Sequence, residues 1–221
     1  MKRTWEKVDN YLSKLLVKPN AAREAALAAN KAAELPAIDV TPLQGQFLAL
    51  LVRMTGARRI LEIGTLGGYS ALWMAQAMSE DGRIVTLELD PQHAEIARSN
   101  LKHAGVDERV EVRVGNALTL LPKLAEQKEG PFDLIFIDGD KTNYTTYLEW
   151  ALKLTHKGTV ILADNVVRDG KVVEADTHDE NVQGVRRMLE QIGSEPRLSA
   201  TALQTVCGKG YDGFVMAVVT G

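Results

Sequence analysis

Leu61-Glu-Ile-Gly-Thr-Leu-Gly-Gly-Tyr-Ser70 joins an apolar, strand-like stretch, Arg59–Gly64, to a helical pattern, Tyr69–Met78. Glycines in such a connection let the backbone turn sharply and approach a ligand closely. Their spacing is G-x-x-G-G, which differs from the G-x-G-x-x-G pattern of dinucleotide-binding folds. Glu62, near the end of the strand, would repel a pyrophosphate and suits a cationic ligand. The segment therefore predicts a strand–turn–helix unit at a small-molecule site, although ordinary turn glycines are the alternative.

Strand-like and helical segments alternate along most of the chain, which predicts a parallel sheet with helices on both faces. The last two strand candidates are joined by Gly208–Gly213, which is too short for a helix and favours an antiparallel hairpin. The prediction is a Rossmann-like α/β fold. The expected strands are Arg59–Gly64, Arg83–Asp90, Val110–Val114, Phe132–Asp138, Thr159–Ala163, Leu198–Val206 and Gly213–Val219, with helices at Tyr69–Met78, Pro91–Ala104, Ala117–Glu126 and Tyr144–Leu154.

The sequence before the first strand reads as helical. Residues 1–55 are predicted to form an N-terminal helical cap region, in which the Ala-rich stretch is a good helix former. Thr41 and Pro42 are typical of the cap and first turn of a helix. The polar loop Val166–Asn181 follows a predicted strand, and loops in that position often close over sites. We expect one domain over residues 1–221.

Composition argues against several classes of protein. The chain has 221 residues, 45% of them hydrophobic, and a formal net charge of −3 with acidic and basic residues interspersed. This composition argues against a nucleic-acid-binding protein. No apolar run approaches the ~20 residues that span a membrane, and no signal peptide is visible. Cys207 is the single cysteine, so no internal disulfide can form and we expect a cytoplasmic protein.

Oxygen donors follow two of the predicted strands. Asp138 ends the fourth strand, with Lys141 shortly after it, and Asp164 and Asn165 follow the fifth. The carboxyl ends of parallel strands form the edge of the sheet where ligands bind. Three oxygens converging there suit Mg²⁺ or Ca²⁺ and leave coordination positions for a substrate. The alternative is that these residues are turn or helix-cap residues.

Several segments together resemble one enzyme family, in order and with compatible spacing. They are LEIGTLGGYSALWMA (61–75), IVTLELDP (84–91), VRVGNA (112–117), FDLIFIDGDKTNY (132–144) and VILADNV (160–166). The set is similar to the class I S-adenosylmethionine methyltransferases. More narrowly, it resembles the cation-dependent O-methyltransferases typified by caffeoyl-CoA and catechol O-methyltransferases. This resemblance extends from about residue 40 to the C-terminus. It implies a seven-stranded, mostly parallel sheet with a C-terminal antiparallel hairpin, and a homodimer.

The resemblance also implies roles for individual residues. Lys141 matches the catalytic base, and the implied cofactors are S-adenosylmethionine and a divalent cation, with Mg²⁺ preferred over Ca²⁺ or Mn²⁺. The implied metal ligands are Asp138, Asp164 and Asn165. The implied cofactor-binding residues are Val40, Glu62, Gly64, Thr65, Ser70, Glu88, Asn116, Ala117 and Asp138.

The expected reaction is divalent-metal-dependent methyl transfer to one hydroxyl of a vicinal aromatic diol. A phenol has a pKa near ~10 and is a poor nucleophile at neutral pH, and a bound metal would stabilise its anion. Asp140 stands where the catechol enzymes carry an aromatic residue, which leaves the acceptor open. The alternatives are a metal-independent methyltransferase of the same fold, a nicotinamide-dependent oxidoreductase and a non-enzymatic binding module.

Overall fold

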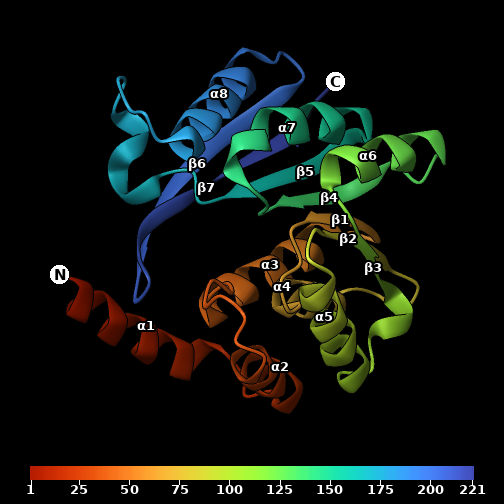
Figure 1. Cartoon of the computed structure of the whole chain (residues 1–221), viewed down its shortest axis with the longest axis vertical. Coiled ribbons are helices and arrows are strands. Elements are labelled where there is room, and N and C mark those ends of the chain that lie inside the picture. The colour runs from red at the N-terminus through yellow and green to blue at the C-terminus, as the bar shows by residue number, and fades with distance from the viewer. The chain divides into compact units, whose positions relative to one another are not determined.

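The computed structural model describes residues 1–221, with the side chain of Lys2 excepted (Figure 1). The chain divides into two compact units, one of residues 12–120 and one of residues 1–11 with 121–221. Seven strands follow the order β3-β2-β1-β4-β5-β7-β6. The pairing is parallel within β1–β3 and between β4 and β5, and antiparallel where β7 joins β5 and β6. The predicted α/β fold with a C-terminal hairpin is confirmed.

Residues 12–120 contain a parallel three-stranded sheet. Its middle strand, β2 (Arg83–Glu88), pairs with both β1 (Arg59–Ile63) and β3 (Val110–Val114). Both β1 and β2 are buried after their first residue, as central strands should be. The connections are α4 (Tyr69–Ala77) and α5 (Pro91–His103), and both helices pack on the sheet.

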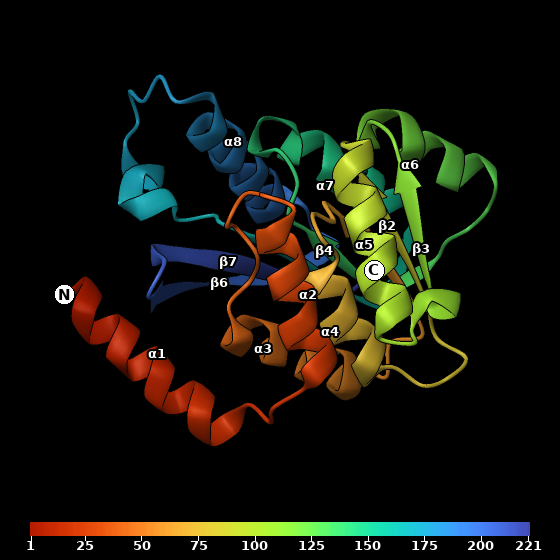
Figure 2. The same cartoon turned by 60° about the horizontal axis from the view of Figure 1, so that its bottom comes forward.

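Three helices precede β1, which confirms the helical character expected of residues 1–55. They are α1 (Lys2–Leu16), α2 (Ala21–Ala32) and α3 (Pro42–Thr55). A capping box begins α3: Thr41 Oγ1 accepts from Gln44 N at 3.2 Å, and Gln44 Oε1 accepts from Thr41 N at 2.9 Å. Helix α2 lies against α4 and α5 (Figure 2).

The second unit contains the other four strands. In it β4 (Phe132–Ile137) runs parallel to β5 (Thr155–Asp164), and β7 (Gly210–Val219) pairs antiparallel with both β5 and β6 (Leu198–Cys207). Helix α7 (Tyr144–Lys153) connects β4 to β5 and packs on both strands. The hairpin prediction is confirmed, and its turn is shorter than expected because the two strands pair as far as Cys207 and Gly210.

One strand boundary and one helix in this unit correct the sequence prediction. Strand β5 begins at Thr155, not Thr159. The prediction began too late because the first four residues of the strand are not buried and lack the apolar pattern that was used to find strands. Helix α8 (Glu180–Ser194) was not predicted. It packs on α7 and β6 and follows the short helix η3 (Arg168–Val173) within the polar loop. Its buried apolar residues recur at helical spacing, at Val182, Val185, Met188 and Ile192.

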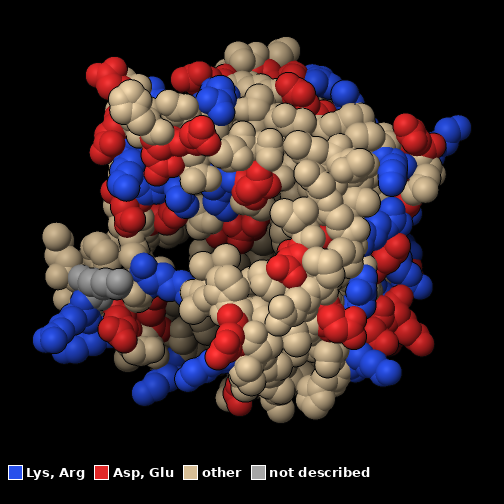
Figure 3. Space-filling model, viewed as in Figure 1, with Lys and Arg blue, Asp and Glu red and all other residues tan. Residues whose placement is uncertain are grey.

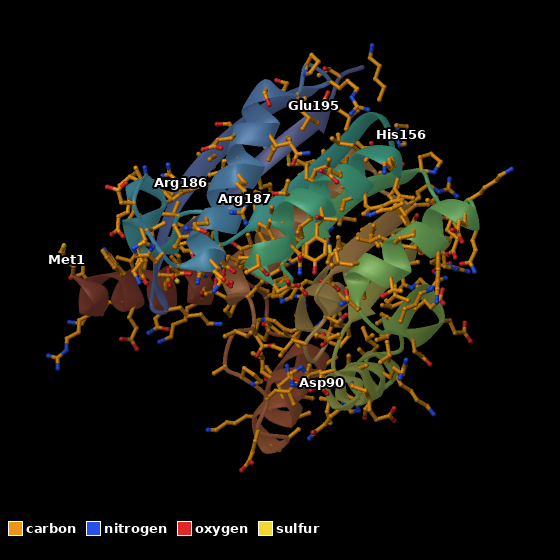
Figure 4. The ribbon with its side chains drawn as sticks, turned by 45° about the horizontal axis from the view of Figure 1, so that its top comes forward. Met1, Asp90, His156, Arg186, Arg187 and Glu195 are labelled. Carbon is orange, nitrogen blue, oxygen red and sulfur yellow. The ribbon has the colours of Figure 1, made fainter. Side chains whose placement is uncertain are left out.

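Polar contacts tie α8 to the segment before it. Figure 4 labels Arg186 and Arg187 on this helix, and Arg186 Nη1 donates to Val172 O at 2.5 Å.

The remaining elements are α6 (Ala117–Glu126) and the short helices η1 (Asp107–Arg109) and η2 (Lys141–Asn143). On the face shown in Figure 3, acidic and basic side chains are intermingled. Among the described residues, no helix is both long enough and apolar enough to cross a bilayer.

Candidate active site

The glycine-rich turn after β1 follows an unusual backbone path. Gly64, Leu66 and Gly68 all have left-handed conformations, with φ of 98°, 50° and 77°. Glycine adopts such angles without strain, whereas Leu66 does so at a cost of roughly 1 kcal/mol or more. Surrounding contacts must therefore hold the turn in this shape.

Glu88, at the end of β2, supplies some of these contacts. Its Oε2 atom accepts hydrogen bonds from Thr65 N at 3.1 Å and Leu66 N at 2.7 Å, and its Oε1 atom accepts from Asp90 N at 2.9 Å. The residue is 7% exposed. Each carboxylate oxygen can accept more than one hydrogen bond, so Glu88 keeps capacity for ligand hydroxyls. An acid at this strand end is suited to ribose hydroxyls.

Glu62 forms a second network beneath the turn. This carboxylate is completely buried and accepts from Ser70 Oγ at 2.5 Å and from Thr86 Oγ1 at 2.6 Å. Thr86 Oγ1 in turn lies 2.6 Å from Thr65 Oγ1. Hydrogen bonds therefore connect four of the predicted cofactor-binding residues: Glu62, Thr65, Ser70 and Glu88.

The other residues predicted for this part of the site lie outside that network in the described structure. Val40 is buried directly before the cap of α3. Asn116 is exposed after β3, and its Oδ1 atom accepts from Leu118 N at 2.8 Å, while Ala117 begins α6. Asn116 therefore has a capping role of its own, and cofactor contacts by these three residues stay a prediction.

The second unit brings the predicted acids and lysine together at the ends of β4 and β5. Lys141 Nζ donates to Asp138 Oδ1 at 2.8 Å and to Gly139 O at 3.1 Å. Asp164 is 6% exposed at the end of β5. Burial, reinforced by the neighbouring Asp138 carboxylate, raises the pKa of Asp164 to about 7. Two carboxylates so arranged favour a shared cation.

Asn165 follows Asp164 in a left-handed conformation, with φ of 58°. Asparagine tolerates this conformation better than most residues because its short polar side chain can hydrogen-bond locally. Asp164 Oδ1 accepts from Asn165 N at 2.8 Å, and Tyr144 OH donates to Asp164 O at 2.9 Å. The end of β5 is thus fixed from two directions.

Asp212, on β7, also holds this region and was missed by the sequence analysis. Its Oδ1 atom accepts from Val167 N and Arg168 N, each at 3.0 Å. Val166 N donates to Gly213 O at 2.9 Å. Asp212 therefore anchors the chain directly after Asn165. Aspartate side chains often accept hydrogen bonds from backbone N–H groups. The sequence alone does not show which segment of the chain supplies those N–H groups to Asp212.

Among the described residues, the acceptors of Lys141 Nζ are Asp138 and Gly139, and the Asp140 carboxylate has other donors. This carboxylate accepts from Thr142 Oγ1 at 3.2 Å and also from Asn143 Nδ2 and Tyr147 OH. Burial, and then the bond to Asp140, raise the pKa of Tyr147. Asp140 therefore helps to shape η2, whose first residue is Lys141, which is 8% exposed.

The donor chemistry of this cluster fits a divalent cation. Asp138 and Asp164 offer carboxylate oxygens and Asn165 offers an amide oxygen, which suit hard ions such as Mg²⁺. Among the described residues, no group of three or more histidine, cysteine, aspartate and glutamate side chains could hold a metal ion. The predicted set has two carboxylates and one amide, so metal binding stays a prediction.

The fold and the two clusters define a Rossmann-like class of enzyme that carries a glycine-rich turn and acids at the ends of its strands. A family model described as O-methyltransferase matches residues 18–215. The chain belongs to this O-methyltransferase family.

Relatives support the same assignment. Catechol O-methyltransferases from Niastella koreensis and Mycobacterium tuberculosis are 48% and 52% identical to the chain, over 97% and 96% of it and 97% and 94% of their own lengths. The solved O-methyltransferase from Bacillus cereus in complex with SAH matches with a TM-score of 0.98 and 56% identity, covering 100% of both chains. TomG from Streptomyces achromogenes in complex with SAM has a TM-score of 0.96 and 47% identity, covering 100% and 99%.

Proposed function

We propose that this protein transfers a methyl group from S-adenosylmethionine to one hydroxyl of a vicinal aromatic diol and uses a divalent cation to do so. The observation that carries the proposal is the buried Asp164 carboxylate beside Asp138, with Lys141 Nζ 2.8 Å from Asp138 Oδ1. The relatives named for catechol O-methylation support the acceptor class, and those solved with SAM or SAH support the cofactor.

The cofactor is assigned to the turn after β1. Glu88 would accept hydrogen bonds from the ribose hydroxyls, and Gly64 lets the backbone approach the ligand. The buried Glu62 carboxylate, oriented by Ser70, gives the turn a negative charge that suits a sulfonium cofactor. Thr65, Val40, Asn116, Ala117 and Asp138 are proposed as further cofactor contacts.

The metal is assigned to Asp138, Asp164 and Asn165, with Mg²⁺ preferred and Ca²⁺ or Mn²⁺ as alternatives. When bound, such an ion lowers the pKa of a hydroxyl whose oxygen it binds. In the proposed reaction the methyl group leaves the sulfonium sulfur and bonds to the acceptor oxygen, and the sulfur keeps the electron pair. Lys141, as the neutral amine, takes the hydroxyl proton at Nζ and becomes an ammonium, and the products are a methyl ether and S-adenosylhomocysteine. Asp138 holds that nitrogen in place.

One observation favours a second candidate, a metal-independent methyltransferase of the same fold. The Lys141 ammonium already contacts Asp138, so this carboxylate has a cationic neighbour without any metal. In that case Lys141 and Asp138 would orient the acceptor hydroxyl by hydrogen bonding, and the two clusters would still bind cofactor and acceptor.

Comparison of Asp164→Ala with Asp133→Ala separates the two candidates. Asp133 also contributes a carboxylate from the β4–β5 region, but it pairs with His156 at 2.9 Å, which makes it a matched control. We expect Asp164→Ala to lose Mg²⁺-dependent methyl transfer to catechol while its far-ultraviolet circular dichroism is unchanged. Asp133→Ala should keep near-normal turnover. Full activity of Asp164→Ala, or of the wild type in EDTA, would contradict the metal-dependent proposal.

A further inference from the structure

Two buried asparagines lie behind the glycine-rich turn. Asn30, on α2, is 2% exposed, and Asn100, on α5, is 6% exposed. Asn100 Nδ2 donates to Gly67 O and to Asn30 Oδ1, each at 2.9 Å. Asn30 Nδ2 donates to Asp39 Oδ1 at 2.8 Å. One hydrogen-bonded chain therefore connects α5, α2, the turn and the residue before Val40.

Asn30 also packs directly on the backbone of the turn. A Cβ atom at Gly67 would lie 1.9 Å from Asn30 Oδ1 and 2.3 Å from its Cγ atom. No side chain fits in that space, so glycine at this position is explained by the close approach of Asn30. Shape and hydrogen bonding both indicate that the turn and the asparagine pair form one packed unit.

The turn is held from two sides by different groups. Glu88 accepts from the N–H groups of Thr65 and Leu66, and Asn100 donates to the carbonyl oxygen of Gly67. The left-handed backbone of Leu66 lies between the Leu66 N–H group that Glu88 binds and the Gly67 carbonyl that Asn100 binds. A conformation of this kind persists only where its surroundings impose it.

We propose that Asn30 and Asn100 are positioning residues for the cofactor, a role that rests on the proposed cofactor site. They hold the turn in its binding conformation and connect it to Asp39 at the start of the segment that contains Val40. Without them the turn relaxes, and only the fraction of molecules with the correct turn binds cofactor tightly. The expected signature is a weaker cofactor affinity with an unchanged turnover number at saturating cofactor.

A purely structural role predicts a different result. Buried asparagines with satisfied hydrogen bonds stabilise a fold, and their loss lowers the unfolding temperature wherever they lie. In that case the folded fraction of a variant binds cofactor as the wild type does. Affinity measured on folded protein is therefore the readout that separates the two roles.

The first test measures S-adenosylhomocysteine binding by isothermal titration calorimetry at a temperature where every variant is folded. Asn100→Leu removes the amide and keeps the number and branching of the side-chain heavy atoms. Arg98→Met is the control, since it removes another hydrogen bond of α5, from Arg98 Nη2 to Val112 O at 2.7 Å. We expect Kd to rise about tenfold for Asn100→Leu, in line with two lost hydrogen bonds, and to stay within about twofold for Arg98→Met.

Glu88→Ala shows whether the cofactor site itself is correctly assigned. If the wild type binds S-adenosylhomocysteine and Glu88→Ala does not, the site stands. Asn100→Leu with a wild-type Kd and a lowered unfolding temperature then overturns the positioning role alone. If Glu88→Ala binds as the wild type does, the site assignment fails and the positioning role fails with it.

A double variant tests the part played by Asn30. Gly67→Ala should destabilise the fold, because its methyl group meets the Asn30 side chain. In Gly67→Ala combined with Asn30→Ala, the methyl group gains space and the unfolding temperature should rise above that of Gly67→Ala alone. The affinity for S-adenosylhomocysteine should remain weak, since the bonds to Asn100 and Asp39 are lost. Recovery of wild-type affinity in the double variant would overturn the role of Asn30.

Discussion

The buried Asp164 carboxylate is needed for the proposed metal site, but its charge lowers the stability of the metal-free fold. Burial and Asp138 raise the pKa of its carboxyl from 3.8 to about 7. The folded protein therefore binds a proton between these values that the unfolded chain has released, and stability declines as the pH rises through this window. A metal ion bound at neutral pH would offset this cost.

The isosteric change Asp164→Asn removes the buried charge. In chelator it should stabilise the protein by about 2–4 kcal/mol at pH 8, because the shift spans roughly three pKa units. The gain should shrink towards pH 4, where the wild-type carboxyl is protonated. Thermal unfolding of both proteins across this range is the measurement. A stability difference that does not depend on pH would show that Asp164 has an ordinary pKa.

Lys141 is the residue proposed to accept a proton. Lys141→Met removes the proton acceptor, and we expect kcat to fall by about 10²–10⁴, the usual range for general acid–base catalysis. Lys141→Arg keeps a cation beside Asp138 yet cannot be deprotonated, so it should be similarly inactive. The measurement is kcat from steady-state kinetics at saturating cofactor. Lys153→Met is the control because it removes a lysine whose amine lies over the Trp150 ring and not beside Asp138. An active Arg variant would show that Lys141 acts by charge alone.

Among the elements, α8 carries a signal that the sequence does contain, since its buried apolar residues recur at helical spacing. Strands were predicted from continuous apolar runs and the N-terminal helices from their composition and caps. The apolar residues of α8 are spaced among charged ones, directly after a polar loop, and the helix was overlooked.

Asp212 was missed for another reason. Its backbone partner Val167 is 45 residues away, and such a pairing depends on the register of β7 beside β5. The positions of the acids and the lysine were predictable because each lies at the end of a strand or shortly after it.

Helix α8 also supports the segment that carries Lys141. A Cβ atom at Gly184 would lie 2.1 Å from Lys141 O, so the helix packs closely on η2. Gly184→Ala should therefore cost about 1–3 kcal/mol and lower kcat by displacing Lys141. Gly193→Ala, on the same helix with open space around it, should be neutral or stabilise by up to about 1 kcal/mol. Chemical denaturation and kinetics of the two variants provide the comparison. Equal stability of both would contradict the close packing.

At the scale of the whole molecule, the family match spans both compact units, so the turn and the acid–lysine cluster belong to one enzyme. The sequence predicted the strand–helix alternation and the C-terminal hairpin, since both are local features. It predicted the roles of the individual site residues through resemblance, and these roles stay predictions. The homodimer and the single domain over residues 1–221 also stay predictions.

The most direct measurement is methyl transfer from S-adenosylmethionine to catechol and to phenol, each assayed with Mg²⁺ and with EDTA. Phenol is the control because it has one hydroxyl and cannot offer two adjacent oxygens to an ion. The proposed function predicts turnover of catechol with Mg²⁺, restoration of that turnover when Mg²⁺ is added back after EDTA, and no comparable turnover of phenol. Equal rates with Mg²⁺ and EDTA, or equal rates for catechol and phenol, would contradict it.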